Sequence, residues 1–225
     1  MKIWHISDTH SFHGLLQIPE NIDIVIHSGD ESNYYDVYKN EQECRDFMEW
    51  FGSLNIPHKI MIGGNHSAFI ATRTREFKDL CKEKNIIYLE NEGVEIEGLK
   101  IWGSPYSPTF GNWYFMKSRD KMWKVWENIP EDTDILITHT PPRGCLDLSY
   151  NRNHQLEFCG CSNLLKNIFR VKPKLHLFGH IHSCEGVLNA GQMKLANLDT
   201  IFSNGSVVTD GKFGKLSSNG NIFEL

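Results

Sequence analysis

The first part of the chain alternates short apolar runs, rich in β-branched residues, with longer amphipathic stretches. The short runs predict buried strands at residues 2–6, 22–27, 59–62 and 86–89. Apolar side chains recur at helical spacing in the stretches between them, which predicts helices over 40–54 and 72–84. Strands that alternate with helices in this way are typical of a layered α/β fold.

The pattern changes in the middle of the chain. The runs 94–96 and 99–103 are joined by Glu97-Gly98, a pair typical of a hairpin turn, so antiparallel strands join the sheet. Later elements are a strand at 134–138, a helix near 161–170 and a strand at 174–178. A sandwich of two mixed sheets flanked by helices accommodates these elements better than a purely parallel sheet.

Two further regions complete the organisation of the chain. Residues 104–130 are dense in aromatic side chains and end in a predicted helix, and the glycine-punctuated tail predicts β-hairpins. The sequence contains no internal repeat, no low-complexity segment and no linker. Because 225 residues that are 40% hydrophobic suffice for one sizeable core, we expect a single domain over 1–225.

Charge and hydropathy exclude several classes of function. A net charge of -5 and a pI near 6.1 argue against a sequence-independent nucleic-acid binder, because such proteins neutralise phosphates with clustered Lys and Arg. No apolar stretch approaches the roughly 20 residues that a membrane span requires. The N-terminus runs into a predicted strand instead of a signal-peptide segment. We therefore expect neither membrane spanning nor secretion.

The cysteines favour a reducing compartment. The chain is long enough to fold without disulfides, and its six cysteines are scattered, so we expect reduced thiols and a cytoplasmic protein. Cys159-Gly160-Cys161 is too tight for the usual zinc knuckle and predicts a loop with one buried thiol.

Polar clusters with metal-ligand character follow directly on the predicted strands. They are Asp8-Thr9-His10, Gly29-Asp30, Gly63-Gly64-Asn65-His66, Thr138-His139 and Gly179-His180-Ile181-His182. In layered α/β folds the carboxyl ends of strands converge on one edge, where ligands bind. Carboxylate, imidazole and amide donors without a thiolate suit hard or borderline divalent cations. The clusters therefore predict a two-metal hydrolytic site, whereas the lone strand histidines His5, His27 and His176 are typical of core residues.

With these clusters in this order, the chain resembles the calcineurin-like metallophosphoesterase superfamily, whose signature runs D-x-H, G-D, G-N-H, H and G-H-x-H. The match spans residues 8–182. Segments such as Ile101-Trp102-Gly103-Ser104-Pro105 and His139-Thr140-Pro141-Pro142 are similar to the small metallophosphoesterase-domain subgroup, which is like the class III cyclic nucleotide phosphodiesterases. The resemblance implies a four-layer α-β-β-α sandwich of two mixed sheets, with a dinuclear metal site at the strand ends.

The resemblance also implies the roles of the site residues. Asp8, His10 and His182 would hold the first ion, Asp30 would bridge, and Asn65, His139 and His180 would complete the second. The ions would be Mn²⁺, with Fe, Zn or Ni as alternatives. A bridging water between them would attack the phosphorus in line. His66 would donate a proton to the departing alkoxide.

Two positions depart from the family pattern. Members commonly carry an acidic residue after G-N-H, where this chain has Ser67. A carboxylate there would orient His66 and favour its protonated form, so the serine predicts a weaker acid step. The further Asp that often follows G-D is also absent, and the chain reads Glu31-Ser32-Asn33. Asn33 is either a hydrogen-bonding substitute or a turn residue.

Substrate contacts are less well defined by the sequence. Arg143 shares a loop with His139 and is placed for a phosphate oxygen, and His13 could approach the first metal site. Trp113, with its neighbours Phe110 and Tyr114, offers a π-face for a nucleobase at the rim of the cleft or packs a helix against the sheet.

The acidic charge and small size favour a small phosphodiester or nucleotide substrate, with a cyclic nucleotide as one candidate. The alternatives are a nuclease acting on DNA or RNA ends, a phosphomonoesterase, and a non-catalytic module that keeps its metals as structure. A nuclease would need a basic groove that the linear sequence does not show. The oligomeric state stays open.

Overall fold

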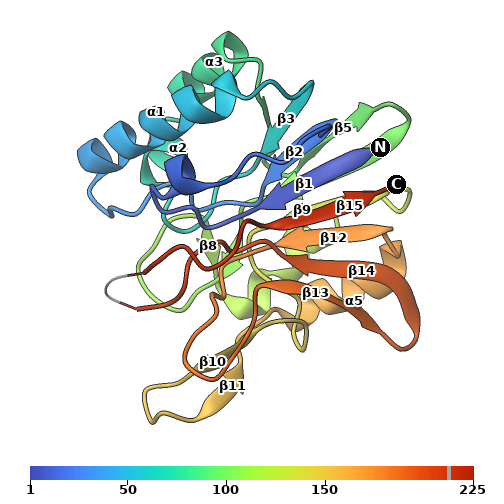
Figure 1. Cartoon of the computed structure of the whole chain (residues 1–225). Coiled ribbons are helices and arrows are strands. Elements are labelled where there is room, and N and C mark those ends of the chain that lie inside the picture. Colours follow the sequence, from blue (N-terminus) through green and yellow to red (C-terminus); the bar gives the residue numbers. More distant parts are fainter. Residues whose placement is uncertain (212–213) are drawn as a thin grey trace.

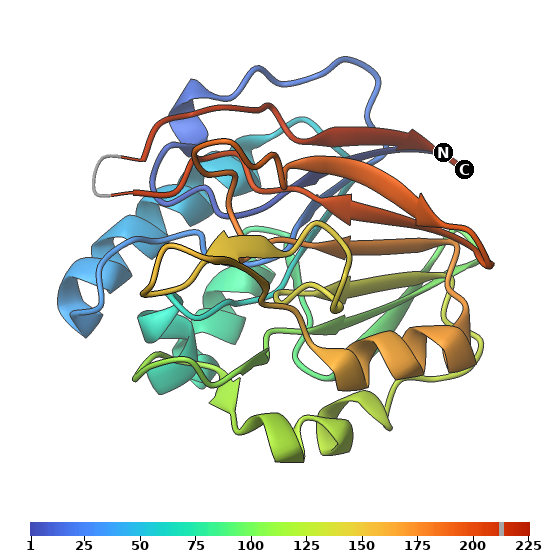
Figure 2. The same ribbon diagram turned by 90° about the horizontal axis from the view of Figure 1, so that it is seen from below.

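Two β-sheets face each other in the computed structural model, and helices cover the outer face of each sheet (Figure 1). The structure describes residues 1–211 and 214–225. The helices α1 (Val37–Ser53), α2 (Ala68–Thr72) and α3 (Thr74–Glu83) pack on one sheet, and α4 (Trp123–Trp126) and α5 (Ser162–Val171) pack on the other; Figure 2 shows the molecule from below. This is the predicted four-layer α-β-β-α sandwich of two mixed sheets.

The first sheet has the order β15-β1-β2-β3-β4. Its strands are β1 (Lys2–Ile6), β2 (Ile24–His27), β3 (His58–Met61), β4 (Ile87–Tyr88) and β15 (Asn221–Glu224). The strands β1 to β4 run parallel, as the alternation of strands and helices predicts, and β15 pairs antiparallel with β1. The tail therefore returns to the beginning of the chain instead of forming only local hairpins.

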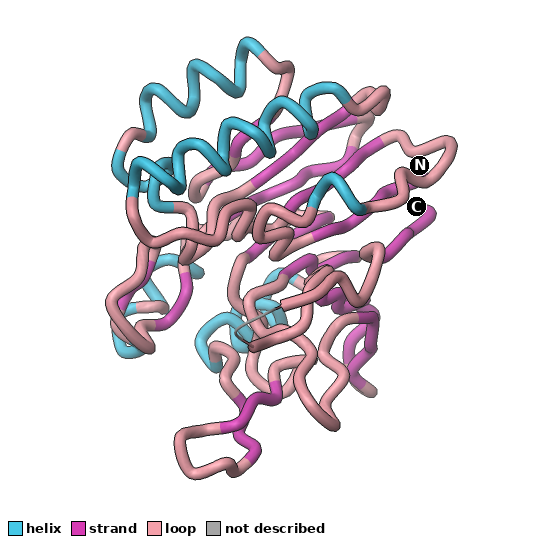
Figure 3. Tube along the Cα trace, turned by 60° about the vertical axis from the view of Figure 1, so that its left-hand side comes forward, coloured by secondary structure: helices cyan, strands magenta, loops and turns pink. Residues whose placement is uncertain are grey.

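The second sheet has the order β13-β14-β12-β9-β6-β5. Its strands are β5 (Glu92–Ile96), β6 (Leu99–Ser104), β9 (Ile135–Thr138), β12 (Leu175–Phe178), β13 (Gly191–Leu195) and β14 (Leu198–Asn204). The predicted turn at Glu97-Gly98 is present, and both residues have positive φ, as the type I′ hairpin turn requires. Two short pairs lie outside the sheets: β7 (Ser107–Pro108) with β8 (Met116–Lys117), and β10 (Leu148–Tyr150) with β11 (Leu156–Phe158). The β10–β11 hairpin, which the sequence did not predict, projects from the body as an arm (Figure 3).

The main difference between the predicted and the observed helices is an interruption at Arg73, within the helix predicted over 72–84. The longer ones are α1 (Val37–Ser53), α3 (Thr74–Glu83) and α5 (Ser162–Val171), and the shorter ones are α2 (Ala68–Thr72) and α4 (Trp123–Trp126), with 3₁₀ turns at His13–Leu15 and Arg119–Lys121. Asp36 caps α1 by accepting a hydrogen bond from the Lys39 amide at 3.1 Å. The backbone leaves helical geometry at Arg73, so α3 is preceded by the separate turn of α2. None of the helices in the described ranges combines the length and apolarity needed to cross a membrane.

Three apolar layers hold the sandwich together. Alternate residues of a strand point to opposite faces, so Trp4 and Ile6 pack beneath α1 to α3 while Ile3 packs between the two sheets. Trp126 and Ile168 pack α4 and α5 against the second sheet. Because the parallel strands are buried on both faces, they read as nearly continuous apolar runs in the sequence. This packing fixes the strand ends relative to one another.

The three lone strand histidines are core residues, as expected. Their hydroxyl partners lie at 2.8 to 3.1 Å: Ser28 and Ser203 for His5, Thr9 for His27, and Thr138 for His176. All three side chains are buried, and burial lowers the pKa of each to about 3. The folded protein therefore keeps them neutral at a pH where an unfolded chain would protonate them.

We expect the free energy of unfolding, measured by urea denaturation in EDTA, to fall as the pH is lowered from 7 to 5. The unfolded chain takes up protons at the ordinary histidine pKa of about 6.5, whereas the buried rings take them up only near pH 3. His176→Asn should reduce this slope by up to about 1.4 kcal/mol per pH unit. The exposed His154→Asn serves as the control, and equal slopes in the two variants would contradict the explanation.

Candidate metal centre

The predicted polar clusters meet at one edge of the molecule. Asp8 and His10 follow β1, Asp30 follows β2, and Asn65 with His66 follow β3. From the second sheet, His139 follows β9, and His180 with His182 follow β12. Their donor atoms form two groups, Asp8 with His10 and His182, and Asp30 with His139 and His180, and within each group these atoms lie within 4.8 Å of one another. The topology thus brings together every residue predicted as a metal ligand.

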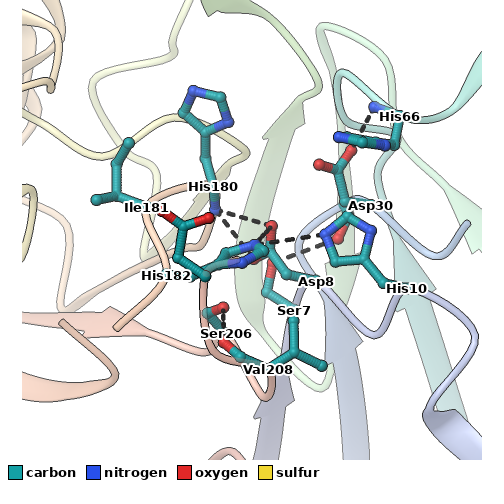
Figure 4. A network of polar contacts seen from close by, with 12 residues as sticks. Ser7, Asp8, His10, Asp30, His66, His180, Ile181, His182, Ser206 and Val208 are labelled. Atoms are coloured by element: carbon teal, nitrogen blue, oxygen red, sulfur yellow. Dashed lines mark hydrogen bonds and ion pairs between the residues drawn. The ribbon is translucent and has the colours of Figure 1, made fainter. Parts of the chain in front are cut away.

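The first group is built around the carboxylate of Asp8 (Figure 4). His182 Nε2 lies 3.2 Å from Asp8 Oδ1 and 3.4 Å from His10 Nε2. His10 Nδ1 lies 2.9 Å from the Ser32 carbonyl, so this nitrogen donates and Nε2 keeps its lone pair. Two imidazole nitrogens and a carboxylate oxygen that face one common space suit a divalent cation.

The second group has the same construction. His139 Nδ1 lies 2.9 Å from the Ser28 carbonyl, which directs Nε2 toward the site. His139 Nε2 is 3.2 Å from Asp30 Oδ2 and 2.9 Å from Asn65 Oδ1. The other oxygen of Asp30 accepts a hydrogen bond from the His66 amide at 2.7 Å, which joins the loops after β2 and β3. The donor set again contains nitrogen and oxygen without sulfur, which matches the ions expected from the sequence.

The site attracts positive charge. Burial alone would raise the pKa of Asp8 and Asp30, but the nearby histidines outweigh it and hold both below the usual range. For His139, burial is outweighed by the charge and hydrogen bond of Asp30, which raise its pKa to about 9. Burial lowers the pKa of His10 to about 4 and of His180 to about 3, so these rings stay neutral, the form that binds a metal.

The backbone around the site is strained. Asp8, His10, Asp30 and His180 all have φ between 40° and 70°, in the left-handed region that costs L-residues about 1–3 kcal/mol each. A Cβ at Gly179 would collide with the Asp8 carboxylate. The chain therefore needs glycine where it passes closest to the acid, and the surrounding layers hold a geometry that local preferences disfavour.

His66 lies beside the two groups and belongs to neither. Its Nδ1 lies 2.9 Å from the Asn33 carbonyl, and its ring packs on Trp113 with centroids 4.3 Å apart. The ring of His10 meets it edge to face at 4.8 Å. Figure 4 shows His66 next to Asp30, on the side of the site away from His182. His66 is therefore close to the metal-ligand residues, and its role as the proton donor stays a prediction.

The structure shows what orients His66 when no carboxylate follows it. The main-chain carbonyl of Asn33 lies 2.9 Å from His66 Nδ1, and the weaker acid step stays a prediction. The Ser67 hydroxyl instead donates to Glu31 Oε2 at 2.6 Å and accepts from the Gly64 amide at 2.8 Å. Asn33 therefore acts through its backbone, which neither of the two sequence-based alternatives described.

Glu31 is the residue that the sequence analysis missed. Its side chain is buried, burial raises its pKa, and its second oxygen accepts from the Ser32 hydroxyl at 2.9 Å. Through Ser67 it ties the loop after β2 to the loop after β3. The sequence did contain a signal for this contact. The chain has an acidic residue at position 31 and lacks the acidic residue that family members commonly carry at position 67.

Of the three predicted substrate contacts, Trp113 and Arg143 lie beside the site and His13 lies elsewhere. Trp113 packs on the ring of His66, and Phe110, 5.2 Å from the ring of His180, lines the cleft over the metal ligands. Arg143 lines a cavity that also reaches His180. His13 was wrongly placed: it is buried under α1, with its Nε2 3.1 Å from Asp46 Oδ2. The thiol of Cys161 is buried and Cys159 is partly exposed, as the loop interpretation predicts.

We expect Glu31→Ala to loosen the site. The change leaves the buried Ser67 hydroxyl without its acceptor and leaves the Ser32 hydroxyl only a 3.4 Å contact to the Asn40 carbonyl, which should cost about 1–3 kcal/mol of folding free energy and lower the metal content after dialysis. Urea denaturation and elemental analysis measure both effects. Glu185→Ala, at an exposed position, is the control, and a Glu31→Ala protein indistinguishable from it would refute this role.

Comparisons with known proteins show the family of the chain. The family model described as Calcineurin-like phosphoesterase matches residues 1–184. The chain is 36% identical over 215 residues to metallophosphoesterase domain-containing protein 1 of Homo sapiens and of Mus musculus. These alignments cover 85% of this chain and 64% of each relative. A UPF0046 protein of Caenorhabditis elegans is 32% identical over 209 residues, with 88% and 69% covered.

A solved structure shares the fold. It superposes with a TM-score of 0.64 at 14% sequence identity, and covers 90% of this chain and 89% of its own. The similarity therefore extends across both sheets.

Proposed function

The chain belongs to the calcineurin-like phosphoesterase family, and from this premise we propose that it is a metal-dependent phosphoesterase that hydrolyses a small phosphodiester, with cyclic nucleotides among the candidates. The observation that carries the proposal is the pair of facing donor groups at the strand ends. In each group a histidine has its Nδ1 committed to a main-chain carbonyl, so that Nε2 is presented to the site.

The position of each residue determines which ion it would bind. Asp8, His10 and His182 would hold one ion, Asn65, His139 and His180 the other, with Asp30 between them. Two divalent ions bound there would supply an activated water and neutralise the phosphoryl oxygens. The mixed nitrogen and oxygen donors favour Mn²⁺, with Fe, Zn and Ni as alternatives.

His66 would supply the proton to the leaving oxygen. Its Nδ1 donates to the Asn33 carbonyl, which leaves Nε2 as the atom that gives up a proton. Trp113 fixes the ring plane from one side. When the P–O bond of a phosphodiester breaks, one ester group departs as an alkoxide that takes up this proton, so the arrangement is suited to that reaction.

Activity should disappear on chelation and return with Mn²⁺ better than with Ca²⁺, which prefers all-oxygen ligands. The assay compares bis-p-nitrophenyl phosphate, p-nitrophenyl phosphate, 2′,3′- and 3′,5′-cyclic nucleotides and single-stranded DNA. We expect the small diesters to be hydrolysed fastest. Undiminished turnover after prolonged dialysis against EDTA would overturn the proposal. Preference for the monoester would replace its diester part, and preference for DNA would replace the small substrate by a nucleic acid.

Asp30→Asn should lower the content of at least one ion and remove nearly all activity, because the substitution removes one of the two carboxylate charges of the site. Asp199→Asn, at an exposed position, should change neither quantity. The measurements are elemental analysis and initial rates. A variant at position 30 that keeps two ions and ordinary rates would contradict the bridging role.

His66→Ala should keep both ions and lose about 10²- to 10⁴-fold in rate on a diester with a poor leaving group, the usual range for general acid catalysis. The loss should be much smaller with p-nitrophenolate, which departs without a proton. An equal loss for both substrates, or loss of an ion, would place His66 in substrate binding or among the metal ligands.

A further inference from the structure

A second cavity, of about 640 Å³, opens next to the metal centre. Phe110, Ser149, His180 and Ile181 line this cavity and also the cleft over the metal ligands, so the two spaces adjoin each other. A phosphate held by the ions would therefore have room beside it for the remainder of a substrate. No step proposed above uses this space.

Two arginines reach the cavity from separate segments of the chain. Arg143 Nη1 donates to the Phe158 carbonyl at 2.8 Å, and its guanidinium lies over the Phe158 ring at 5.7 Å. Arg119 donates to the Gly160 and Cys159 carbonyls at 3.2 and 3.0 Å. These acceptors are neutral, and within the described ranges no carboxylate lies within 4.0 Å of either guanidinium. Both arginines thus keep their charge for a ligand.

A buried carboxylate holds the backbone next to the two arginines in place. The buried carboxylate of Asp147 accepts from the Gly144 amide at 3.1 Å and from the Gly160 amide at 2.8 Å. A Cβ at Gly160 would lie 2.7 Å from the Pro142 carbonyl oxygen, so this close approach requires glycine. The loop after His139 and the loop before α5 are thereby held together, and the carbonyls that orient Arg119 and Arg143 are fixed in advance.

The composition of the lining defines the chemistry of its ligand. Arg119 and Arg143 bring two positive charges and Glu157 one negative charge, which leaves the cavity cationic on a chain whose net charge is -5. Phe110 and Phe158 add apolar surface. Planar guanidinium groups with spare N–H donors match phosphate oxygens. A ligand with an apolar body and a phosphate of its own fits this lining.

We propose that the cavity binds the part of the substrate beyond the scissile phosphate, and that Arg119 and Arg143 hold a second phosphate there. The preferred substrate is then a small phosphodiester that also carries a phosphate monoester. This inference rests on the proposed phosphodiesterase function, and it adds a substrate class and a second anion-binding residue, Arg119, to it.

The test uses a matched pair of substrates with the metal-loaded protein: adenylyl-(3′→5′)-adenosine with and without a 5′-terminal phosphate. The terminal phosphate should raise kcat/KM about tenfold or more, mainly through KM, which corresponds to about 1.4 kcal/mol of added binding. Arg119→Gln and Arg143→Gln should each bring this ratio toward one. Arg152→Gln, at an exposed position outside the lining, should leave the ratio unchanged.

Equal kcat/KM for the two dinucleotides, release of inorganic phosphate from the terminal position, or a ratio untouched by both arginine variants would overturn the second-phosphate site while leaving the phosphodiesterase proposal standing. Failure to cleave bis-p-nitrophenyl phosphate would defeat the phosphodiesterase proposal instead. In that case binding is measured instead, by tryptophan fluorescence titration of the Mn²⁺-loaded protein with each dinucleotide. A dissociation constant about tenfold lower for the dinucleotide with the terminal phosphate would support the second-phosphate site, and equal constants would overturn it.

Discussion

The concentration of carboxylates and imidazoles at the ends of two sheets is the constraint on which the rest of the structure depends. Asp8 and Asp30 are almost fully buried, and both have left-handed backbone. Burying charged groups and straining the chain each cost free energy. Hydrogen bonds from His182 and His139 offset part of that cost, and a bound cation would offset more. The apolar layers around the site keep this unfavourable geometry in place.

The main chain orients most of the site. Carbonyls of Ser28, Ser32 and Asn33 accept from His139, His10 and His66 in turn. All three carbonyls lie in the single loop after β2, which also carries Asp30. One ordered loop therefore sets the direction of one histidine in each donor group and of the proposed acid. Glu31 anchors this loop through Ser67, which explains why a buried acid stands so close to the site without facing it.

Local patterns predicted what depends on neighbours in the sequence. The parallel strands and the polar clusters behind them could be read because an apolar run followed by Asp, Asn or His is visible at short range. The pairing of β15 with β1 could not, since it joins opposite ends of the chain. His13 was misplaced because α1 folds over it, and closeness to His10 in sequence does not carry a side chain into the site. The Asn33 carbonyl was invisible because any residue supplies a carbonyl, whatever its side chain.

Anomalous diffraction from a crystal of the Mn²⁺-loaded protein tests the central claim most directly. The account predicts two manganese peaks about 3.5–4 Å apart, the usual spacing in two-metal hydrolytic sites. One peak should contact Asp8, His10 and His182, the other Asn65, His139 and His180, with Asp30 between them. A single peak, or two peaks away from these side chains, would contradict the claim that the strand ends form a dinuclear centre.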